Sequence, residues 1–262
     1  MQAVRVALVT GAGTGVGAAT ARSLGARGYA VLVNYSRSAD EAAQVVDQLR
    51  AGSADAVAVQ GDVAQDADCR ALAQAALDRW GRIDVLVNNA GITSFAGAGN
   101  WDAIDAELFQ RIVGVNALGA FQMIRACAPA LKARRGAIVN VSSTAGKLGV
   151  GSSVAYIASK GALNAMTLYF ARALAPEVRV NAVCPGMIET RWFVDGLGQQ
   201  AFEKLKAGYE AGVPLARTCS AEDVAEAVVY FADGARTVTG EMLLLDSGMH
   251  LGAMPRVPPP AR

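Results

Sequence analysis

The sequence has 262 residues, of which 53% are hydrophobic and 18% charged, a composition typical of a folded globular chain rather than a disordered one. Its 24 basic and 23 acidic residues leave a net charge of +1, so no basic field is available to hold nucleic acid. A single histidine and four cysteines without CxxC spacing argue against a zinc site or a histidine-based triad, and no metal site is expected.

The chain begins with an apolar segment, residues 4–9, that lacks the charged start and long apolar core of a signal peptide. No stretch approaches the roughly 20 consecutive apolar residues that a membrane span needs. The scattered cysteines are typical of reduced thiols. These features predict a cytoplasmic protein without a membrane partner.

Short apolar runs alternate with longer amphipathic segments along the whole chain. Strands are expected at residues 4–10, 30–34, 56–60, 85–88, 136–142, 178–183 and 242–245. Helices are expected at residues 16–27, 39–51, 66–80, 106–133, 154–174 and 221–231. The alternation predicts a single-domain α/β fold, a doubly wound parallel sheet of about seven strands with helices on both faces. Residues 187–214 form a long insertion expected to be a lid, and 255–262 a flexible proline-rich tail.

The first expected strand leads into a glycine-rich turn with glycines at Gly11, Gly15 and Gly17. Glycine allows a tight turn and a close approach of the backbone to phosphate groups, and the free N–H groups of the following helix favour anions. A strand, such a turn and a helix start together predict a site for a dinucleotide pyrophosphate.

Tyr156 and Lys160 lie four residues apart on an expected helix, so both side chains share one helix face. A phenol has an ordinary pKa near 10, and a nearby ammonium group lowers it. The pair is therefore a candidate for a tuned acid and base.

The spacing Gly11-x-x-x-Gly15-x-Gly17 resembles the cofactor turn of the short-chain dehydrogenase/reductase family, and the resemblance extends over roughly residues 4–248. Asn88-Asn89-Ala90-Gly91, Pro185-Gly186 and the Tyr156/Lys160 pair follow in the order of that family. The resemblance implies one NAD(P)-binding Rossmann domain over residues 1–254. It also implies cofactor contacts from Gly11, Thr14, Gly15, Val16, Gly17, Tyr35, Ser36, Arg37, Asp62, Val63, Asn89, Ala90, Gly91, Tyr156, Lys160, Pro185, Gly186, Ile188 and Thr190.

The same resemblance implies a catalytic tetrad of Asn116, Ser143, Tyr156 and Lys160. In it the tyrosine exchanges a proton with the substrate oxygen, the serine polarises that oxygen, and the lysine also binds the nicotinamide ribose. The asparagine keeps the lysine and a bound water in place. Ser142 and Ser143 alternate faces if the strand continues, so only one of them can point at the substrate. The spacing of the family selects Ser143.

The end of the second expected strand bears on the choice of nicotinamide cofactor. An acid at this point usually binds the ribose hydroxyls of NAD and repels a 2′-phosphate. Here the chain reads Tyr35-Ser36-Arg37, with Tyr35 at the place of that acid. A hydroxyl donor and a cation suit a phosphate, so NADP(H) is favoured over NAD(H).

The substrate is a small carbonyl compound or alcohol on this interpretation, and the overall pattern is similar to 3-oxoacyl-acyl-carrier-protein reductases. Lys132, Arg134 and Arg135 could hold an acidic carrier, although a solvated helix end with favourable dipole placement is the preferred explanation. Glu177 stands where carrier-dependent relatives usually have a basic residue. A polyol, sugar or steroid alcohol dehydrogenase and a non-catalytic dinucleotide sensor remain as alternatives.

Two further features concern the pocket and the assembly. Aromatic and aliphatic residues of the expected lid could line a substrate pocket: Trp192, Phe193, Leu197, Phe202 and Tyr209.

The helices at 106–133 and 154–174 carry apolar residues on more than one side, which indicates a second buried face. The resemblance implies that these helices pair between subunits, and a homotetramer is expected.

Overall fold

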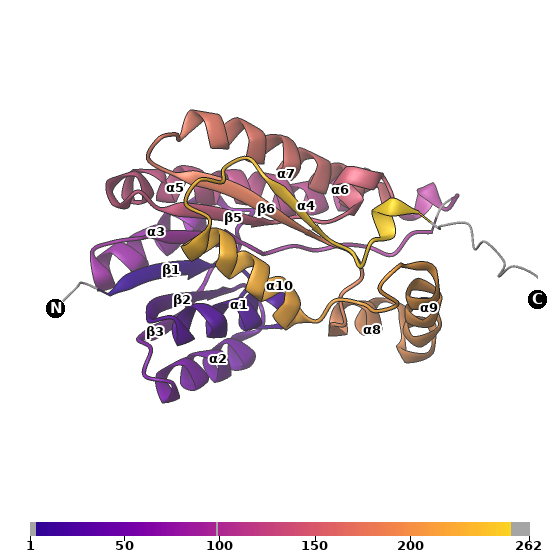
Figure 1. The fold of residues 1–262 in the computed structure, drawn as a ribbon, viewed down its shortest axis with the longest axis horizontal. Coiled ribbons are helices and arrows are strands. Elements are labelled where there is room, and N and C mark those ends of the chain that lie inside the picture. The colour runs from indigo at the N-terminus through magenta and orange to yellow at the C-terminus, as the bar shows by residue number, and fades with distance from the viewer. Residues whose placement is uncertain (1–3, 98, 253–262) are drawn as a thin grey trace, which may run out of the picture.

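The computed structural model describes residues 4–97 and 99–252, which form a seven-stranded parallel sheet between two layers of helices (Figure 1). The strand order is β3-β2-β1-β4-β5-β6-β7. The strands are β1 Arg5–Val9, β2 Tyr29–Tyr35, β3 Ala56–Gln60, β4 Val85–Asn88, β5 Ala137–Val141, β6 Arg179–Pro185 and β7 Met242–Leu245. The predicted fold class is confirmed.

One helical layer packs on each face of the sheet. The helices on one face are α1 Gly15–Ala26, α2 Ala39–Ala51 and α10 Ala221–Val229, which share one apolar core with the sheet. The helices on the other face are α3 Asp66–Trp80, α4 Ala106–Val113, α5 Gly119–Arg134 and α7 Val154–Ala173, of which α3, α5 and α7 supply the second core. The remaining helices are α6 Ala145–Leu148, α8 Arg191–Leu197 and α9 Gln199–Gly212.

The two cores are separated because successive side chains of a strand point to opposite faces. Val31 and Val33 of β2 enter the core beneath α1 and α2, whereas Leu32 enters the core beneath α3 and α5. Both faces of the strand are buried, which explains its continuous apolar sequence.

The order of the strands reverses beside β1, which pairs with β2 on one side and β4 on the other. In open parallel sheets a crevice forms at such a point, beyond the carboxyl ends of the strands. The glycine-rich turn follows β1, the Asn-Asn-Ala-Gly turn follows β4, and Ser143 follows β5 at the same edge. The topology therefore gathers separate motifs at one place.

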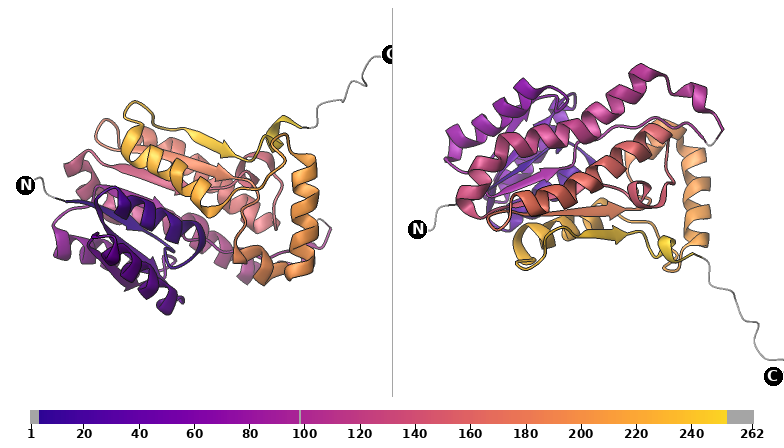
Figure 2. Two further views of the ribbon diagram at one scale, coloured as in Figure 1. Left: turned by 60° about the horizontal axis from the view of Figure 1, so that its bottom comes forward. Right: turned by 90° about the horizontal axis from the view of Figure 1, so that it is seen from above.

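Two segments contain structure beyond what the sequence predicts. The expected helix at 106–133 is helical throughout but contains a π-helical turn, η2 Gly114–Leu118, between α4 and α5. The insertion at 187–214 forms helices α8 and α9, which stand at one end of the molecule beyond the sheet (Figure 2). The tail at 255–262 lies outside the described residues.

The helical run Ala106–Arg134 is long and apolar enough to cross a membrane by length and composition alone. However, 56% of its apolar window is buried inside the protein, where Met123, Ile124 and Leu131 pack in the core beneath the sheet. A core helix explains this composition.

Candidate active site

The glycine-rich turn is shaped for a close backbone approach. Gly11 and Gly15 have φ values of +59° and +53°, in the left-handed region that glycine adopts without strain. A Cβ atom at Gly17 would collide with the carbonyl oxygen of Gly11. The turn therefore requires glycine at these places and leaves the start of α1 open to a phosphate group.

Two polar residues missed in the sequence hold this turn. The Oδ1 atom of buried Asn34 accepts a hydrogen bond from the Gly11 N–H at 3.1 Å. The Thr10 hydroxyl accepts from the N–H groups of Asn89 and Ala90, both at 3.0 Å. The Asn89 amide donates back to the carbonyls of Thr10 and Gly11 at 2.9 and 3.0 Å. The sequence signal that could have identified Thr10 and Asn34 is a polar residue at the end of an otherwise apolar strand.

The predicted acid/base pair lies on α7, which begins where the Ser153 side chain accepts a hydrogen bond from the Tyr156 N–H. Lys160 is 3% exposed, and its Nζ atom donates to the Val141 carbonyl at 2.8 Å. The Nζ atom lies 5.6 Å from the centroid of the Tyr156 ring. Ser143 follows β5, and its hydroxyl faces the Tyr156 phenol closely enough to affect the pKa of that phenol.

Burial controls the protonation of this pair. The Tyr156 phenol group is buried although the whole side chain is only partly covered, and burial raises its pKa to about 12 against a smaller opposing effect of Ser143. Burial also lowers the pKa of Lys160 to about 8. The net shift of the Tyr156 pKa is upward because burial dominates, opposite in sign to the shift expected from a neighbouring lysine. The phenol is protonated at neutral pH and can act as a proton donor.

The depressed pKa of Lys160 gives a stability prediction with a definite sign. Below pH 8 the lysine is protonated in both folded and unfolded chains, so the cost of burying its charge is complete. Between about pH 8 and the ordinary value of 10.5 the folded chain loses the proton first, and stability rises with pH. We expect the free energy of unfolding of the wild type, relative to Lys160→Met, to increase across this window. Urea denaturation of both proteins at pH 7, 8, 9 and 10 measures it, and a constant difference would contradict the burial argument.

Asn116 lies in the π-helical turn, where it joins the turn after β4 to the catalytic helix. Its amide donates to the Ile92 carbonyl at 2.9 Å and to the Ser159 hydroxyl at 3.0 Å, and its Oδ1 atom accepts from the Ile92 N–H at 2.8 Å. Ser159 in turn donates to the Tyr156 carbonyl at 2.7 Å. The direct partners of Asn116 are therefore Ile92 and Ser159 rather than Lys160.

The two neighbouring serines face different surroundings. Ser142 donates to the Oδ1 atom of Asn164 at 2.7 Å in the interior. Ser143 accepts from the Ala145 N–H at 3.1 Å and lies beside Tyr156. The two serines thus point in different directions, as the alternation along a strand predicts, and Ser143, which the spacing of the family selects, is the one beside Tyr156.

The predicted adenosine side of the site is more open. Ser36 and Arg37 are exposed at the end of β2, and Arg37 is close enough to Asp62 to act on its charge. The Asp62 carboxylate also forms an ion pair with Arg111 at 2.8 Å. Val63 packs against Gly119, where a side chain would collide with it. The Arg37 guanidinium group therefore lies at the end of β2, at the place where an acid usually binds the ribose hydroxyls of NAD.

The start of the lid covers the catalytic groups. Thr190 caps α8, with its methyl group close to Gly15, and Ile188 bridges to Cys219. The Trp192 ring meets the Tyr156 ring edge-on, with centroids 6.1 Å apart, and its tip approaches Gly91.

The rest of the lid is held by aromatic and polar contacts. The Phe193 ring lies 5.6 Å from Phe95 and 6.2 Å from Phe202, measured between centroids. Tyr209 donates to the Asp246 carbonyl at 2.8 Å, beside Gly186. Of the expected lid residues, only Trp192 contacts a predicted catalytic residue.

The basic residues considered for carrier binding lie elsewhere. Lys132 and Arg134 are at the end of α5, and Arg135 caps it, at the edge of the sheet where the strands begin. The predicted catalytic residue Ser143 follows the carboxyl end of β5, with Tyr156 beside it, and a five-residue strand spans roughly 17 Å. In the part of the chain that the structure describes, no three histidine, cysteine, aspartate or glutamate side chains gather as metal ligands.

Comparison with known proteins agrees with the geometry. The family model described as enoyl-(acyl carrier protein) reductase matches residues 11–250. A protein assigned as ketoacyl reductase 2 of the granaticin polyketide synthase from Streptomyces violaceoruber is 41% identical, over 94% of this chain and 96% of that protein. The 3-oxoacyl-[acyl-carrier-protein] reductase FabG of Staphylococcus aureus is 34% identical, over 96% of this chain and 100% of that protein.

A solved structure is also similar to this chain over nearly its whole length. A protein assigned as a short-chain dehydrogenase/reductase from Burkholderia xenovorans has a TM-score of 0.88 and 36% identity, covering 96% of this chain and 100% of that chain. A doubly wound sheet with a nucleotide crevice and a tyrosine–lysine pair defines a nicotinamide-dependent oxidoreductase. The chain belongs to the short-chain dehydrogenase/reductase family, and the predicted resemblance and enzyme class are confirmed.

Proposed function

We propose that this protein is an NADP(H)-dependent oxidoreductase that transfers a hydride between the nicotinamide and a ketone or secondary alcohol. The observation that carries the proposal is the buried group at the carboxyl edge of the sheet, in which Ser143 faces the Tyr156 phenol and Lys160 lies on the same helix. The glycine-rich turn suits a dinucleotide, because it has no room for a side chain at Gly17 and leaves bare backbone at the start of α1. When bound, the nicotinamide supplies the hydride chemistry.

The residues of the site then supply protons and polarity. Tyr156, protonated at neutral pH, gives its proton to the carbonyl oxygen during reduction and recovers it in the reverse direction. Ser143 donates a hydrogen bond to the same oxygen, which stabilises the developing negative charge. Lys160 lies close enough to the Tyr156 ring to stabilise phenolate as the proton leaves. The Trp192 ring contacts the Tyr156 ring edge-on and covers part of it.

The preference for NADP(H) rests on the end of β2. Tyr35, Ser36 and Arg37 present a hydroxyl and an exposed guanidinium group where an acid would repel the 2′-phosphate. The guanidinium is planar and matches two phosphate oxygens at once. Asp62 is already paired with Arg111, so it does not cancel the charge of Arg37 by direct contact.

The substrate class that we propose is a 3-oxoacyl thioester or a similar carbonyl compound, because relatives over nearly the full chain are named ketoacyl reductases. The position of Arg134 and Arg135 at the opposite edge of the sheet does not favour a carrier held by these residues. A polyol, sugar or steroid alcohol is the alternative. A panel of free acyl thioesters, carrier-bound thioesters, sugars and steroids, assayed with NADPH and NADH, decides between them. No turnover of any thioester would contradict the first choice.

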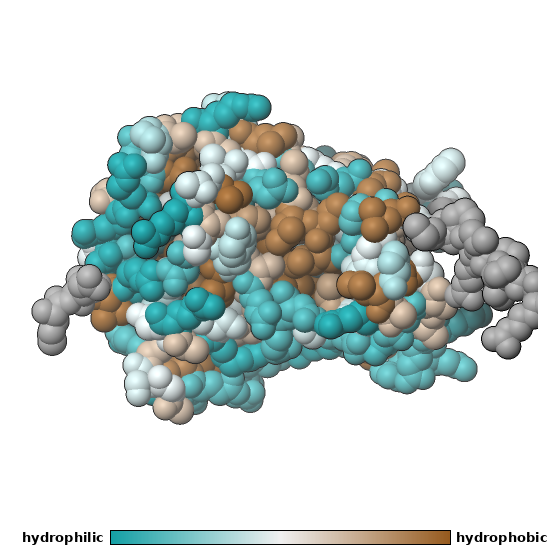
Figure 3. Space-filling view, in the orientation of Figure 1, coloured by the Kyte–Doolittle hydropathy of each residue, from teal (hydrophilic) through white to brown (hydrophobic). Residues whose placement is uncertain are grey.

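We further propose that the protein is cytoplasmic and assembles as a homotetramer. Leu118, on the helical run from α4 to α5, is 47% exposed, and Tyr169, on α7, is 64% exposed. These are the helices that carry apolar residues on more than one side. Figure 3 shows further apolar surface around β7, the edge strand, whose four residues are all partly exposed. Covering these residues by a second copy would remove apolar surface from water.

A charge on the exposed face of α7 tests the assembly. We expect Tyr169→Glu to reduce the mass in light scattering at micromolar concentration, because a buried carboxylate would lack a partner. Tyr169 is a better position than Phe170, which packs against the core beneath the sheet and whose replacement would disturb folding. Tyr169→Phe is the matched control and keeps the apolar contact. A monomeric wild type would contradict the proposal.

A further inference from the structure

A second hollow lies at the edge of the sheet opposite the catalytic residues. Because the strands are parallel, the N-terminal ends of β1, β2, β4, β5 and β6 meet there, and a pocket of about 460 Å³ opens between them. Tyr29 and Asp84, both less than a tenth exposed, contribute to its lining. Five arginines and three carboxylates contribute the charges, an excess of two positive charges.

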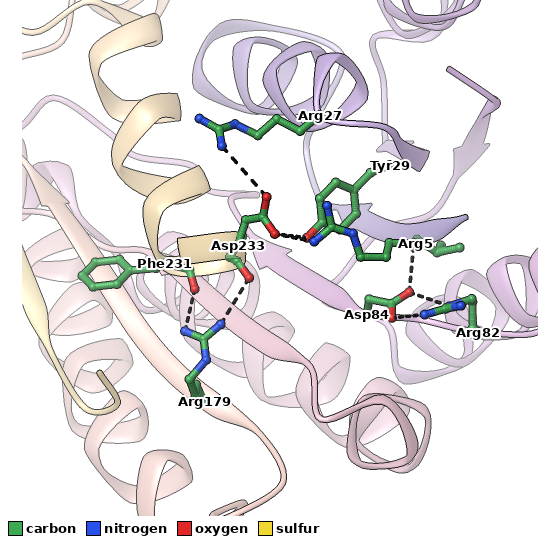
Figure 4. Close-up of polar contacts among 10 residues, drawn as sticks. Arg5, Arg27, Tyr29, Arg82, Asp84, Arg179, Phe231 and Asp233 are labelled. Atoms are coloured by element: carbon green, nitrogen blue, oxygen red, sulfur yellow. Dashed lines mark hydrogen bonds and ion pairs between the residues drawn. The ribbon is translucent and has the colours of Figure 1, made fainter. Parts of the chain in front are cut away.

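Two of the three carboxylates are fully engaged within the wall (Figure 4). Asp233 forms an ion pair with Arg5, accepts a hydrogen bond from the Tyr29 hydroxyl at 3.3 Å and approaches Arg27 at 3.9 Å. Asp84 accepts two hydrogen bonds from Arg82, at 2.8 and 2.6 Å. The charge of Asp233 is therefore balanced by Arg5, which lines the pocket, and the charge of Asp84 by Arg82, which is outside the lining.

The arginine on β6 is held by backbone groups instead. Arg179 donates to the carbonyls of Phe231, Ala232 and Ala235, at 2.7, 3.2 and 2.9 Å, at the end of the helical segment after α10. Among the described residues no carboxylate hydrogen-bonds to this guanidinium, although Asp233 is close enough to act on its charge, so Arg179 contributes positive charge to the pocket. The three carbonyls fix its position.

Three exposed arginines complete the lining. The guanidinium groups of Arg134 and Arg236 make no hydrogen bond or ion pair with any described residue, and that of Arg135 makes only a 3.5 Å contact with the Pro176 carbonyl. Glu177 is the one lining carboxylate, within the described chain, without such a partner. The C-terminal end of α5 offsets only about half an elementary charge. Three guanidinium groups therefore face a positive hollow with unused donors.

We propose that this pocket binds a small polyanion that carries two or more closely spaced phosphate or carboxylate groups. Guanidinium groups bind both kinds of group through paired N–H donors, and several of them around one hollow favour more than one anionic group. The volume lies within the range of small-molecule sites. The ligand does not reach the catalytic residues, which lie beyond the other ends of the strands, so this proposal is independent of the proposed reaction.

Isothermal titration with tripolyphosphate and, separately, citrate tests the site. The cofactor turn must first be saturated with NADPH or NADH, whichever binds more tightly, because it also accepts phosphates. We expect one saturable site per chain for at least one of these probes. The double variant Arg134→Gln/Arg236→Gln should weaken binding by about ten-fold or more, since each lost hydrogen bond to a charged group has roughly that effect.

Lys132→Gln is the matched control, because it removes a charge at the end of α5 without altering the pocket lining. Its affinity should stay within about two-fold of the wild type. No saturable binding to the wild type, or equal losses in the control and the double variant, would overturn the proposal. Retained turnover in the double variant shows that it is folded and that its loss of binding does not concern the catalytic site.

Discussion

Replacing Tyr156 with phenylalanine is expected to abolish measurable turnover while leaving cofactor affinity nearly unchanged. The phenol is protonated at neutral pH and lies beside Ser143, so it is the group placed to give a proton to the substrate oxygen. A positioned acid contributes roughly 10² to 10⁴ to the rate. The ring that remains keeps its edge contact with Trp192 and its place on α7, so the fold and the nucleotide crevice are preserved.

The measurement is a steady-state assay with the best carbonyl substrate, together with a fluorescence titration of the reduced cofactor. Tyr169→Phe is the matched control, because the same hydroxyl is removed from an exposed tyrosine of the same helix. Activity of Tyr156→Phe close to the wild-type value would remove Tyr156 from the proposed proton transfer. A large loss of cofactor affinity would show that the phenol also holds the nucleotide.

Arg37→Ala is expected to weaken NADPH binding by roughly 1.5–3 kcal/mol, which is the scale of a hydrogen bond to a charged group. This corresponds to about ten- to 150-fold in the dissociation constant. NADH binding should change little, because NADH has no 2′-phosphate for the guanidinium to contact. Arg37 is exposed and its guanidinium group makes no hydrogen bond with another described residue, so its removal leaves no buried group unpaired.

Titration of both cofactors against the wild type and the variant decides the question. Arg22→Ala is the control, since Arg22 is an exposed arginine on α1 rather than at the end of β2. Arg37→Lys keeps the charge but loses the paired donors, and we expect an intermediate affinity for NADPH. An equal loss for NADPH and NADH, or a wild-type preference for NADH, would contradict the proposed NADP(H) specificity.

The sequence alone determined the architecture because the relevant signals are local. Strands Ala56–Gln60, Val85–Asn88 and Met242–Leu245 and helices Ala39–Ala51 and Asp66–Trp80 have the predicted bounds. A parallel strand buried on both faces must be apolar throughout, and a covering helix must be amphipathic, so both patterns are visible without contacts. The spacing of Tyr156 and Lys160 depends on one helix and is equally local.

The lid could not be predicted in the same way. Helix α8 has no buried residue, and α9 buries only Phe202, so neither carries a clear apolar stripe. These helices are held instead by contacts with distant segments, such as Phe95 against Phe193 and Tyr209 on Asp246. Such contacts leave little trace in the local sequence.

Only the tertiary structure decided how the site is supported and charged. Asn34 on β2 holds Gly11, Thr10 joins the glycine-rich turn to the turn after β4, and the π-helical turn directs Asn116 to Ile92 and Ser159. The protonation of Tyr156 and Lys160 also follows from burial, which reverses the expected shift of the tyrosine pKa. The physical reason is common to these cases: hydrogen-bond partners and desolvation depend on which segments meet in space, and residue spacing along the chain does not contain that information.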